Sequence, residues 1–295
     1  MASAVWLGCE RVLEGCAVGD VGAVTVIDLD NVTFRRHGRV ILDSVSFVVR
    51  AGEHWALLGP NGAGKSTILG FCGALAHPSS GTVDILGHRI GRVDLQTLRR
   101  SIGHVNPRHP LNSPLTLREV VLTGLTGSIE IPLRWEPTPT QLAHAEALIA
   151  QMGLAGREAD VWPTLSQGER GRALVARALI CEPELLLMDE PMTGLDVAAR
   201  EQLLEIIDAL EDSHPELASI LVTHHLEELP SRTSHALLLS AGRIVSSGLA
   251  SEVLTTEHVS EAFAHPIQVA RHDGRWFART GSARASRPAA AASSQ

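Results

Sequence analysis

The sequence lacks any long apolar segment. No stretch approaches the roughly 20 apolar residues that a helix needs to cross a bilayer, although 44% of the 295 residues are hydrophobic. Residues 1–22 have no basic start before an apolar run, which makes them a poor match to a signal peptide. We therefore expect no membrane-spanning segment, and contact with a membrane, if any, through a partner.

Cysteine and positive charge are also scarce. The four cysteines show no C-x-x-C spacing, so neither a disulfide framework nor a zinc knot is indicated, and reduced thiols in a cytosolic protein explain them better. The 33 Asp and Glu residues outnumber the 25 Lys and Arg residues, giving a net charge of −8. This balance argues against a protein whose main role is to grip nucleic acid, because such a protein needs a basic face.

A glycine-rich segment matches the phosphate-loop pattern G-x-x-x-x-G-K-[ST] at every fixed position. It comprises Gly59, Pro60, Asn61, Gly62, Ala63, Gly64, Lys65, Ser66 and Thr67. The mostly apolar run 53–58 predicts a short buried strand before it, and residues 68–76 after it are rich in helix formers. A strand, a glycine-rich turn and a helix start aim backbone N–H groups at one point, which binds anions. The motif predicts a nucleoside triphosphate site in which Lys65 reaches the β and γ oxygens and Ser66 ligates Mg²⁺.

Two carboxylates follow a second apolar run far downstream. Residues 184–188 form a continuous apolar segment typical of a strand buried on both faces of a parallel sheet, and the segment ends in Asp189 and Glu190. At the carboxyl end of such a strand Asp189 is placed to hold Mg²⁺. Glu190 is placed to orient or deprotonate the attacking water. An exposed acidic turn is the alternative, and the phosphate loop makes it the weaker one.

Between these motifs lies the segment Leu165, Ser166, Gln167, Gly168 and Glu169, followed by a helical run over 170–180. Ser166 with Glu169 three positions later is a capping box, which needs no ligand to explain it. Serine and glycine at a helix start also offer free N–H groups to an anion. Both interpretations stay open on the segment alone.

Taken together, these motifs resemble those of the ATP-binding cassette (ABC) ATPases over about residues 24–248. The segment at 165–169 resembles the family signature Leu-Ser-Gly-Gly-Gln, with Gln167 and Glu169 replacing a glycine and a glutamine. Asp196 takes the acidic position of the D-loop, and His224, after the apolar run 219–223, matches the switch histidine. The resemblance implies that His224 contacts the γ-phosphate region and Glu190. An adjacent His224–His225 metal pair is not expected, because neighbouring side chains diverge along a strand.

The chain departs from the family at two positions. The aromatic ring that usually stacks on adenine would align with Arg36, and there is no tyrosine in the chain to replace it. A guanidinium can stack on a base, so Arg36 is a candidate, with an exposed loop arginine as the alternative. The Q-loop glutamine is also missing: Asn106 carries the same amide one methylene shorter, and His109 is a weaker candidate.

We predict an α/β fold, a P-loop NTPase core of ABC type with an antiparallel β layer and an inserted helical subdomain. The expected divisions are an N-terminal extension (1–23), the ATPase domain (24–250), its helical subdomain (about 107–178), a C-terminal helix and hairpin extension (251–282) and a disordered tail (283–295). The antiparallel layer is expected from short strands within 24–58 and 81–86. The apolar stripe of Leu142, Ala145, Ile149 and Met152 predicts a helix that packs into the core.

The resemblance implies ATP and Mg²⁺ as ligands and a second cassette as partner. In this family the phosphate loop of one cassette faces the signature segment of another, so one chain with a single set of motifs needs a homodimer or a similar cassette. We favour an ATP-hydrolysing subunit of an ABC transporter, of the bacterial importer branch, at the inner face of the cell membrane with a membrane-spanning permease in another chain. Residues 106–120 lie where the family receives the permease. The alternative is a soluble ABC ATPase acting on nucleic acid or ribosomes, which the acidic balance disfavours.

Overall fold

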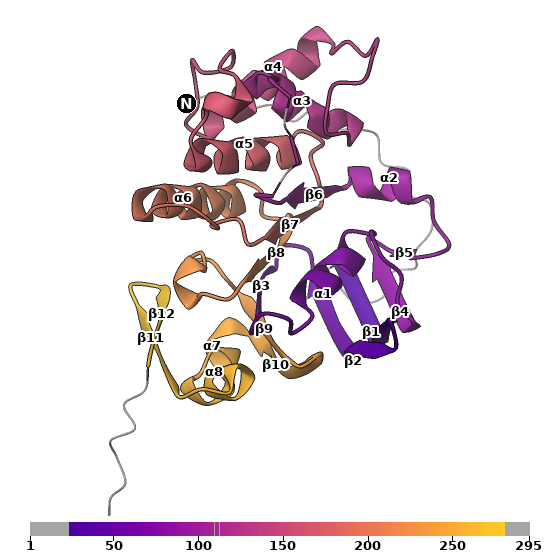
Figure 1. Ribbon diagram of the computed structural model, residues 1–295, viewed down its shortest axis with the longest axis vertical. Coiled ribbons are helices and arrows are strands. Elements are labelled where there is room, and N and C mark those ends of the chain that lie inside the picture. Colours follow the sequence, from indigo (N-terminus) through magenta and orange to yellow (C-terminus); the bar gives the residue numbers. More distant parts are fainter. Residues whose placement is uncertain (1–23, 109, 112, 281–295) are drawn as a thin grey trace, which may run out of the picture.

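A six-stranded sheet with strand order β10-β9-β3-β8-β7-β6 runs through the centre of the molecule (Figure 1). The computed structural model describes residues 24–108, 110–111 and 113–280, so the predictions for 1–23, His109 and 283–295 lie outside the described residues. The strands are β3 (His54–Leu58), β6 (Ile102–Val105), β7 (Leu185–Asp189), β8 (Ala218–Thr223), β9 (His235–Ser240) and β10 (Arg243–Leu249). All neighbours pair in parallel except β9 and β10. Every residue of β3 and β8 is buried, which explains their mostly apolar sequences.

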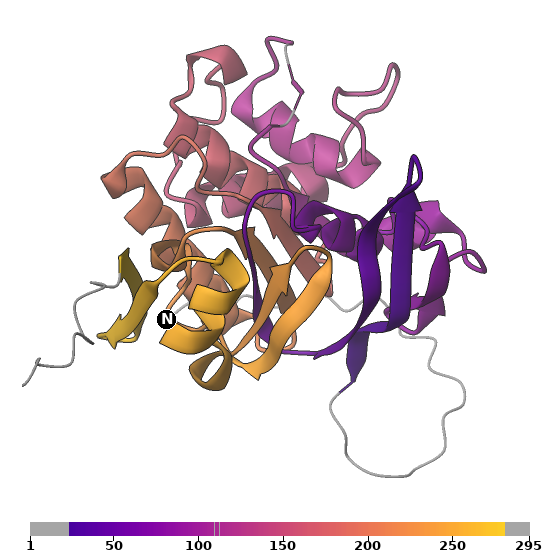
Figure 2. The same ribbon diagram turned by 60° about the horizontal axis from the view of Figure 1, so that its bottom comes forward.

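A second, antiparallel sheet with order β2-β1-β4-β5 lies along one side of this core sheet (Figure 2). Its strands are β1 (Thr25–Arg36), β2 (Arg39–Arg50), β4 (Ser80–Ile85) and β5 (His88–Arg89). The turn between β1 and β2 is made by His37 and Gly38, both at positive φ, which suits a tight hairpin. The expected antiparallel layer is present, but the prediction of short strands was wrong for β1 and β2, which span 12 residues each.

Helix α1 (Lys65–Cys72) packs between the two sheets and joins a core with residues of both. The helix starts at the lysine of the phosphate loop and ends at Cys72, before the end of the 68–76 segment that the sequence favoured. Phe71 and Cys72 are fully buried in this core. The packing ties the phosphate loop to both sheets.

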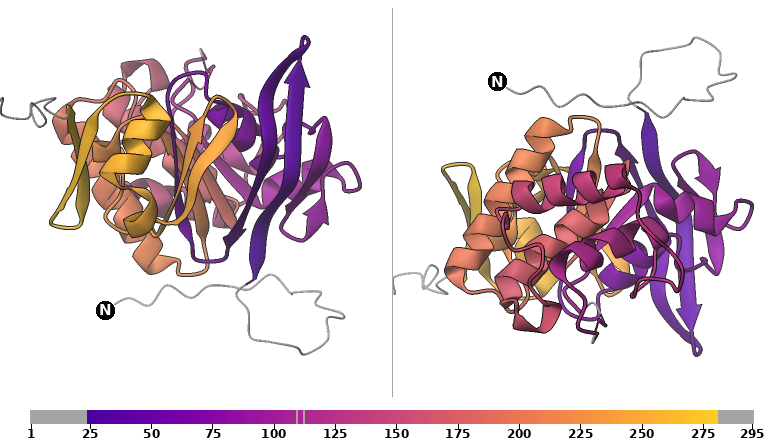
Figure 3. Two further views of the ribbon diagram at one scale, coloured as in Figure 1. Left: turned by 90° about the horizontal axis from the view of Figure 1, so that it is seen from below. Right: turned by 90° about the horizontal axis from the view of Figure 1, so that it is seen from above.

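Helices α3 (Leu117–Thr126), α4 (Pro139–Gln151) and α5 (Gln167–Leu179) form a layer on one side of the core sheet, and α6 (Val197–Ser213) packs between that layer and the strands (Figures 1 and 3). The stripe on α4 packs inward as predicted: Ala145, Ile149 and Met152 are fully buried, and Leu142 is half-buried against the same core.

The C-terminal elements share a hydrophobic core with the helical layer and lie toward the β9–β10 end of the core sheet, away from β6 (Figure 1). They are α7 (Ala250–Val253), α8 (Thr256–Phe263), and the hairpin of β11 (Ile267–His272) and β12 (Arg275–Thr280). The remaining elements are α2 (Leu95–Arg100) and the short 3₁₀ turns η1 (Trp162–Thr164) and η2 (Leu226–Glu228). The hairpin expected from the sequence is present, while the domain boundaries stay predictions.

Candidate functional site

The carboxyl ends of three neighbouring strands, β3, β7 and β8, meet at one edge of the core sheet. Their register places Leu58 beside Thr223 and Asp189 beside Val222. The residues that follow the three strands are therefore brought together, which is where open α/β sheets bind ligands. A cavity of about 630 Å³ opens there. It is lined by Ile41, Asn61, Gly62, Gly64, Lys65, Ser66, Thr67, Arg108, Asp189, Glu190, Thr193 and His224.

The phosphate loop has room for glycine alone at its two outer fixed positions. A Cβ at Gly59 would lie 2.1 Å from the carbonyl oxygen of Leu239, and one at Gly64 would lie 2.6 Å from Leu42 Cδ2. Gly64 also has a φ of 109°, which an L side chain disfavours, and it caps the start of α1. Because the first N–H groups of a helix have no partner inside the helix, the loop presents donors to the cavity.

Lys65 is the only lysine in the chain, and its side chain is buried with the residue 6% exposed. Its Nζ donates to the carbonyl oxygens of Gly59 at 2.7 Å and Pro60 at 3.1 Å. Burial lowers the pKa of Lys65, while the charges of Glu190 and Asp189 oppose the shift. The loop carbonyls thus hold a desolvated ammonium group at the place where phosphate oxygens are expected.

The two carboxylates differ in environment. Asp189, the last residue of β7, is half-buried, and burial raises its pKa, with a further increase from the neighbouring charge of Glu190. Glu190 has a φ of 50°, an uncommon value for a residue other than glycine. Its backbone N–H donates to the carbonyl of Val222 at 2.9 Å, which ties the turn after β7 to β8.

His224 lies beside Glu190. Its Nδ1 is 3.3 Å from Glu190 Oε1, but the contact lacks hydrogen-bond geometry, so this buried nitrogen has no hydrogen-bond partner within the described chain. The ring of His224 lies 4.1 Å, centroid to centroid, from that of His225. The expectation that these neighbouring side chains diverge was wrong, because both follow the end of β8 and no longer alternate across the sheet. Among the described residues no group of three or more metal-ligating side chains is found.

Arg108 was not a candidate from the sequence. Its Nη2 donates to Glu190 Oε2 at 3.2 Å, and the residue lines the cavity. Its position in the loop directly after β6 was the available signal, since that strand ends at the same edge of the sheet as β7. Ile41 and Thr193 also line the cavity and were not candidates.

Two candidates lie outside the lining of this cavity. Arg36 is the exposed last residue of β1. Asn106 is half-buried, and its Oδ1 accepts a hydrogen bond from the backbone N–H of Arg108 at 2.8 Å, so the amide shapes the loop that presents that arginine. Their proposed contacts with adenine and Mg²⁺ stay predictions.

The segment at 165–169 also lies outside this cavity, at the start of α5. The predicted capping box is present: the Ser166 N–H donates to Glu169 Oε2 at 2.8 Å, and the Glu169 N–H donates to Ser166 Oγ at 3.3 Å. The other oxygen of Glu169 accepts from Arg157, which neutralises the carboxylate.

Asp196 lies at the start of α6, and Gly168, near the start of α5, lies against the first turn of α6. Asp196 Oδ1 accepts from the backbone N–H of Ala199 at 2.8 Å and caps α6. A Cβ at Gly168 would lie 2.8 Å from the Cβ of Ala199. Gly168 therefore permits close contact between α5, which begins in the segment 165–169, and α6, which Asp196 caps.

The cavity residues fit a nucleoside triphosphate and a magnesium ion. His224 lines the cavity beside the carboxylate that Arg108 contacts, and a ring N–H of this side chain is able to donate to a phosphate oxygen. Ser66 and Asp189 supply the hydroxyl and carboxylate oxygens that Mg²⁺ prefers. Burial raises the pKa of Asp189, and a nearby cation would favour its charged form.

The parallel core sheet and the phosphate loop define a P-loop nucleoside triphosphatase. The chain matches the ABC transporter family over residues 42–193, which is just over half of its length. It is 38% identical over 258 residues to the uncharacterized ABC transporter ATP-binding protein YlmA of Bacillus subtilis (strain 168), covering 85% of this chain and 96% of that one. It is 34% identical over 255 residues to the hemin import ATP-binding protein HmuV of Nocardia farcinica (strain IFM 10152), covering 85% and 86%.

Solved structures agree with this assignment. An ATP-binding cassette solved as a dimer in a post-hydrolysis state with ADP and Pi overlays with a TM-score of 0.65 at 26% identity, covering 76% of this chain and 98% of the other. The chain belongs to the ABC transporter family. It is an ATP-binding protein and ATPase of an ABC transporter, with the ABC-type fold, and the resemblance drawn from its motifs is confirmed. No helix within the described ranges is both long enough and apolar enough to cross a membrane.

Proposed function

We propose that the chain powers transport as an ATP-sandwich dimer, with Mg²⁺ at each nucleotide and a membrane-spanning permease in another chain. One observation carries the dimer: the cavity around Lys65 has no lining residue from 165–169, although both segments belong to one ATPase domain. A second cassette would supply its Ser166 and Gly168 to complete the site. The dimeric relative solved with ADP and Pi supports this arrangement.

Within the site, each side chain takes a role that suits its position. Lys65 and the loop N–H groups bind the β- and γ-phosphates, and Ser66 with Asp189 would hold Mg²⁺, which neutralises phosphate charge when bound. Glu190 orients the attacking water and accepts its proton. His224, which lines the cavity, donates a ring N–H to the γ-phosphate.

The relatives support the proposals for the partner and the location. HmuV is named as a hemin import protein, and that substrate is said of HmuV alone. For this chain we propose the importer branch, a permease that docks near residues 106–120, and a place at the inner face of the cell membrane. Direct binding of nucleic acid is not part of the proposal, in keeping with the net charge of −8.

The hydrolytic role is tested by Glu190→Gln. ATP binding should persist while turnover falls by about two to four orders of magnitude, because the amide no longer accepts the proton of water. The variant should also accumulate as a dimer with Mg-ATP, since the nucleotide that joins the two copies is no longer cleaved. Hydrolysis assays and sedimentation measure both effects. Turnover near that of the parent would remove Glu190 from this role.

The nucleotide site itself is tested by Lys65→Ala. Removing the single ammonium from the loop should abolish triphosphate binding, because neutral N–H donors alone remain there. Equilibrium binding of a labelled ATP analogue measures the loss, with Arg92→Ala as a charge-matched control outside the cavity. Unchanged affinity in Lys65→Ala would place the phosphates elsewhere.

A further inference from the structure

The C-terminal hairpin of β11 and β12 packs against η2, the short turn that follows His224. The backbone N–H of Ala278 in β12 donates to Glu227 Oε1 at 3.0 Å. Trp276 of β12 and Leu226 of η2 are buried in the same hydrophobic core. The hairpin is therefore fixed to the segment that presents His224, which lines the nucleotide cavity.

Arg275, the first residue of β12, joins this turn to a helix. Its Nη1 donates to Glu201 Oε2 at 3.0 Å, and its Nη2 donates to the carbonyl oxygen of Glu227 at 2.9 Å. Glu201 lies in the second turn of α6, the helix that Asp196 caps. A single guanidinium group thus links α6 to the turn after His224.

The surroundings of Arg275 favour a well-defined link. Its side chain is only 22% exposed, and the planar guanidinium holds its donors in a fixed arrangement. Burial acts to raise the pKa of Glu201, but the hydrogen bonds and charges of Arg275 and Arg200 outweigh burial and lower that pKa. Glu201 therefore stays charged at neutral pH, and its hydrogen bond with Arg275 is charge-assisted.

The segment that carries His224 is held at both of its ends. At one end, Thr223 Oγ1 accepts from the backbone N–H of His225 at 3.1 Å and donates to the carboxylate of Glu228. At the other end, the carbonyl of Glu227 accepts from Arg275. Loss of the Arg275 contact would leave the segment anchored less firmly on the side away from β8.

Helix α6 leads to the other side of the same site. The chain before its cap is a tight turn, in which the Thr193 N–H donates to the carbonyl of Glu190 at 3.1 Å. Glu190 and Thr193 both line the nucleotide cavity, and Glu190 Oε1 lies 3.3 Å from His224 Nδ1. Arg275 therefore connects the two segments that bring Glu190 and His224 together.

We propose that Arg275 is a positioning residue for ATP hydrolysis, whose bridge between Glu201 and Glu227 holds His224 in place relative to Glu190. The proposal rests on the proposed function, because that function gives Glu190 and His224 their roles. Arg275 lies outside the lining of the nucleotide cavity and outside residues 42–193, which match the family. It acts through these two segments and not through contact with the nucleotide.

The first test needs no nucleotide. Arg275→Met removes the guanidinium and keeps a long apolar stem. The backbone amides of 225–229 should then exchange with deuterium about two- to tenfold faster, the range for loss of one hydrogen bond. Arg279→Met is the matched control, since Arg279 Nε donates to Gln268 within the same hairpin at 3.1 Å. Exchange in Arg275→Met equal to that of the parent would overturn the proposal.

The second test separates turnover from binding. Arg275→Met should lower kcat about three- to thirtyfold, because His224 is less well placed. The Kd of Mg-ATP should stay within about twofold of the parent, since the phosphate loop is unchanged. Equal losses in kcat and affinity, or parent-like kcat, would count against a positioning role.

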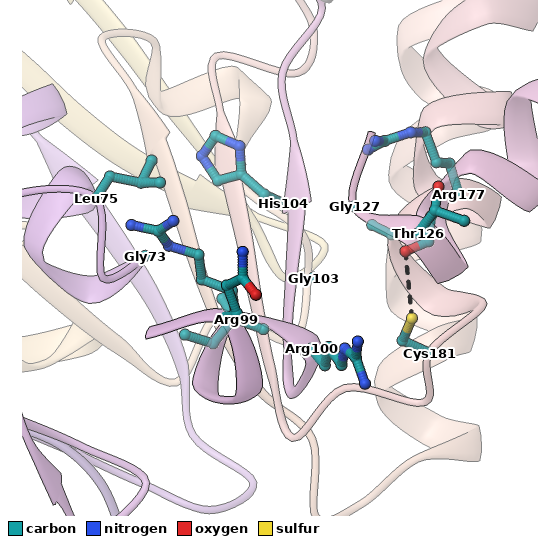
Figure 4. Close-up of a pocket in the computed structure, with 14 residues that line it drawn as sticks. Gly73, Leu75, Arg99, Arg100, Gly103, His104, Thr126, Gly127, Arg177 and Cys181 are labelled. Atoms are coloured by element: carbon teal, nitrogen blue, oxygen red, sulfur yellow. Dashed lines mark hydrogen bonds between the residues drawn. The ribbon is translucent and has the colours of Figure 1, made fainter. Parts of the chain in front are cut away.

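Two further arginine variants serve as comparisons. Arg99 lines a separate cavity of about 390 Å³ beside β6 (Figure 4) and donates twice to the carbonyl of Ala74, at 3.1 and 2.6 Å. Arg99→Met loses these bonds away from the nucleotide and should retain the parent kcat. Arg275→Lys keeps the charge but has one nitrogen in place of the fork, so its kcat should lie nearer to that of Arg275→Met. Full recovery by lysine would overturn the two-sided bridge.

The third test asks whether Arg275 acts through His224. In a His224→Ala background, Arg275→Met should lower turnover no further, because the residue that it positions is already lost. Losses that multiply in the double variant would overturn the proposal. If Glu190→Gln and His224→Ala lower turnover and Arg275→Met does not, the bridge fails while the proposed function stands.

Discussion

Arg108 and Glu190 lie in contact across the mouth of the nucleotide cavity, with Nη2 and Oε2 3.2 Å apart. They are separated by 82 positions in the sequence, and the parallel pairing of β6 with β7 brings them together. The Arg108 side chain is 76% exposed, so the pair adds little to stability. We expect Arg108 to affect the binding of the nucleotide instead.

Arg108→Ala should leave the melting temperature nearly unchanged and weaken Mg-ATP binding by up to about fivefold, the range for one exposed charge contact. The cause is the loss of one of two cationic side chains that line this cavity, the other being Lys65. Titration with ATP at fixed salt measures the change, and Arg108→Lys should recover much of it. Affinity equal to the parent in Arg108→Ala would exclude contact with the nucleotide.

A second prediction decides what covers the adenine base. If Arg36 stacks on it, Arg36→Ala should weaken Mg-ATP binding by about two- to thirtyfold and Arg36→Tyr should restore it. Ile41 is the competing candidate, because it lines the cavity. Dissociation constants of the Arg36 variants and Ile41→Ala, measured at the same salt concentration, compare the two. Equal constants for the parent and both Arg36 variants would exclude stacking by Arg36.

The contact between α5 and α6 gives a third prediction. Gly168→Ala should destabilise the protein by about 1–3 kcal/mol, because its Cβ would lie 2.8 Å from the Cβ of Ala199, which has no flexible end to move. Gly171→Ala is the matched control on the same helix. Its Cβ would meet nothing closer than Leu203 Cδ2 at 3.9 Å, so higher helix propensity should stabilise the protein by up to about 1 kcal/mol. Urea denaturation measures the unfolding free energy of both variants. Equal changes in the two variants would contradict the prediction.

The strands and the phosphate loop were predictable because each is encoded within a few residues. Mostly apolar runs mark β3, β7 and β8, and the capping box at Ser166 and Glu169 is likewise local. Arg108 was missed because its role depends on the pairing of β6 with β7, which no local pattern specifies. The contact between His224 and His225 was misjudged for a related reason, since strand alternation stops at Thr223.

A buried pair between β3 and α6 gives the fourth prediction. His54 Nδ1 lies 3.3 Å from Glu211 Oε1 and 3.0 Å from Ser219 Oγ. Burial lowers the pKa of His54 to about 4 and raises the pKa of Glu211 to about 8. Both groups are therefore neutral near pH 7. The contact is not an ion pair, although the two atoms lie only 3.3 Å apart.

The pH dependence of stability follows from these directions. Between about pH 4.5 and 6.5 the two groups oppose each other, because folding binds a proton at Glu211 and releases one at His54. From pH 6.5 to 8 Glu211 acts alone, so its contribution makes the unfolding free energy fall by about 1–2 kcal/mol as the pH rises. Denaturation at pH 6.5 and 8 measures the loss. Glu211→Gln, which keeps the shape and cannot ionise, should remove it, and an unchanged pH dependence in that variant would exclude Glu211 as the cause.

The capping box has a consequence for how this segment varies among sequences. Ser166 and Glu169 satisfy each other's backbone N–H groups, and Arg157 neutralises the remaining oxygen of Glu169. The acid is tolerated at this position because its charge is balanced inside the chain. Ser166, Glu169 and Arg157 should therefore change together during divergence, and exchange of any one alone would leave a helix end or a charge without its complement.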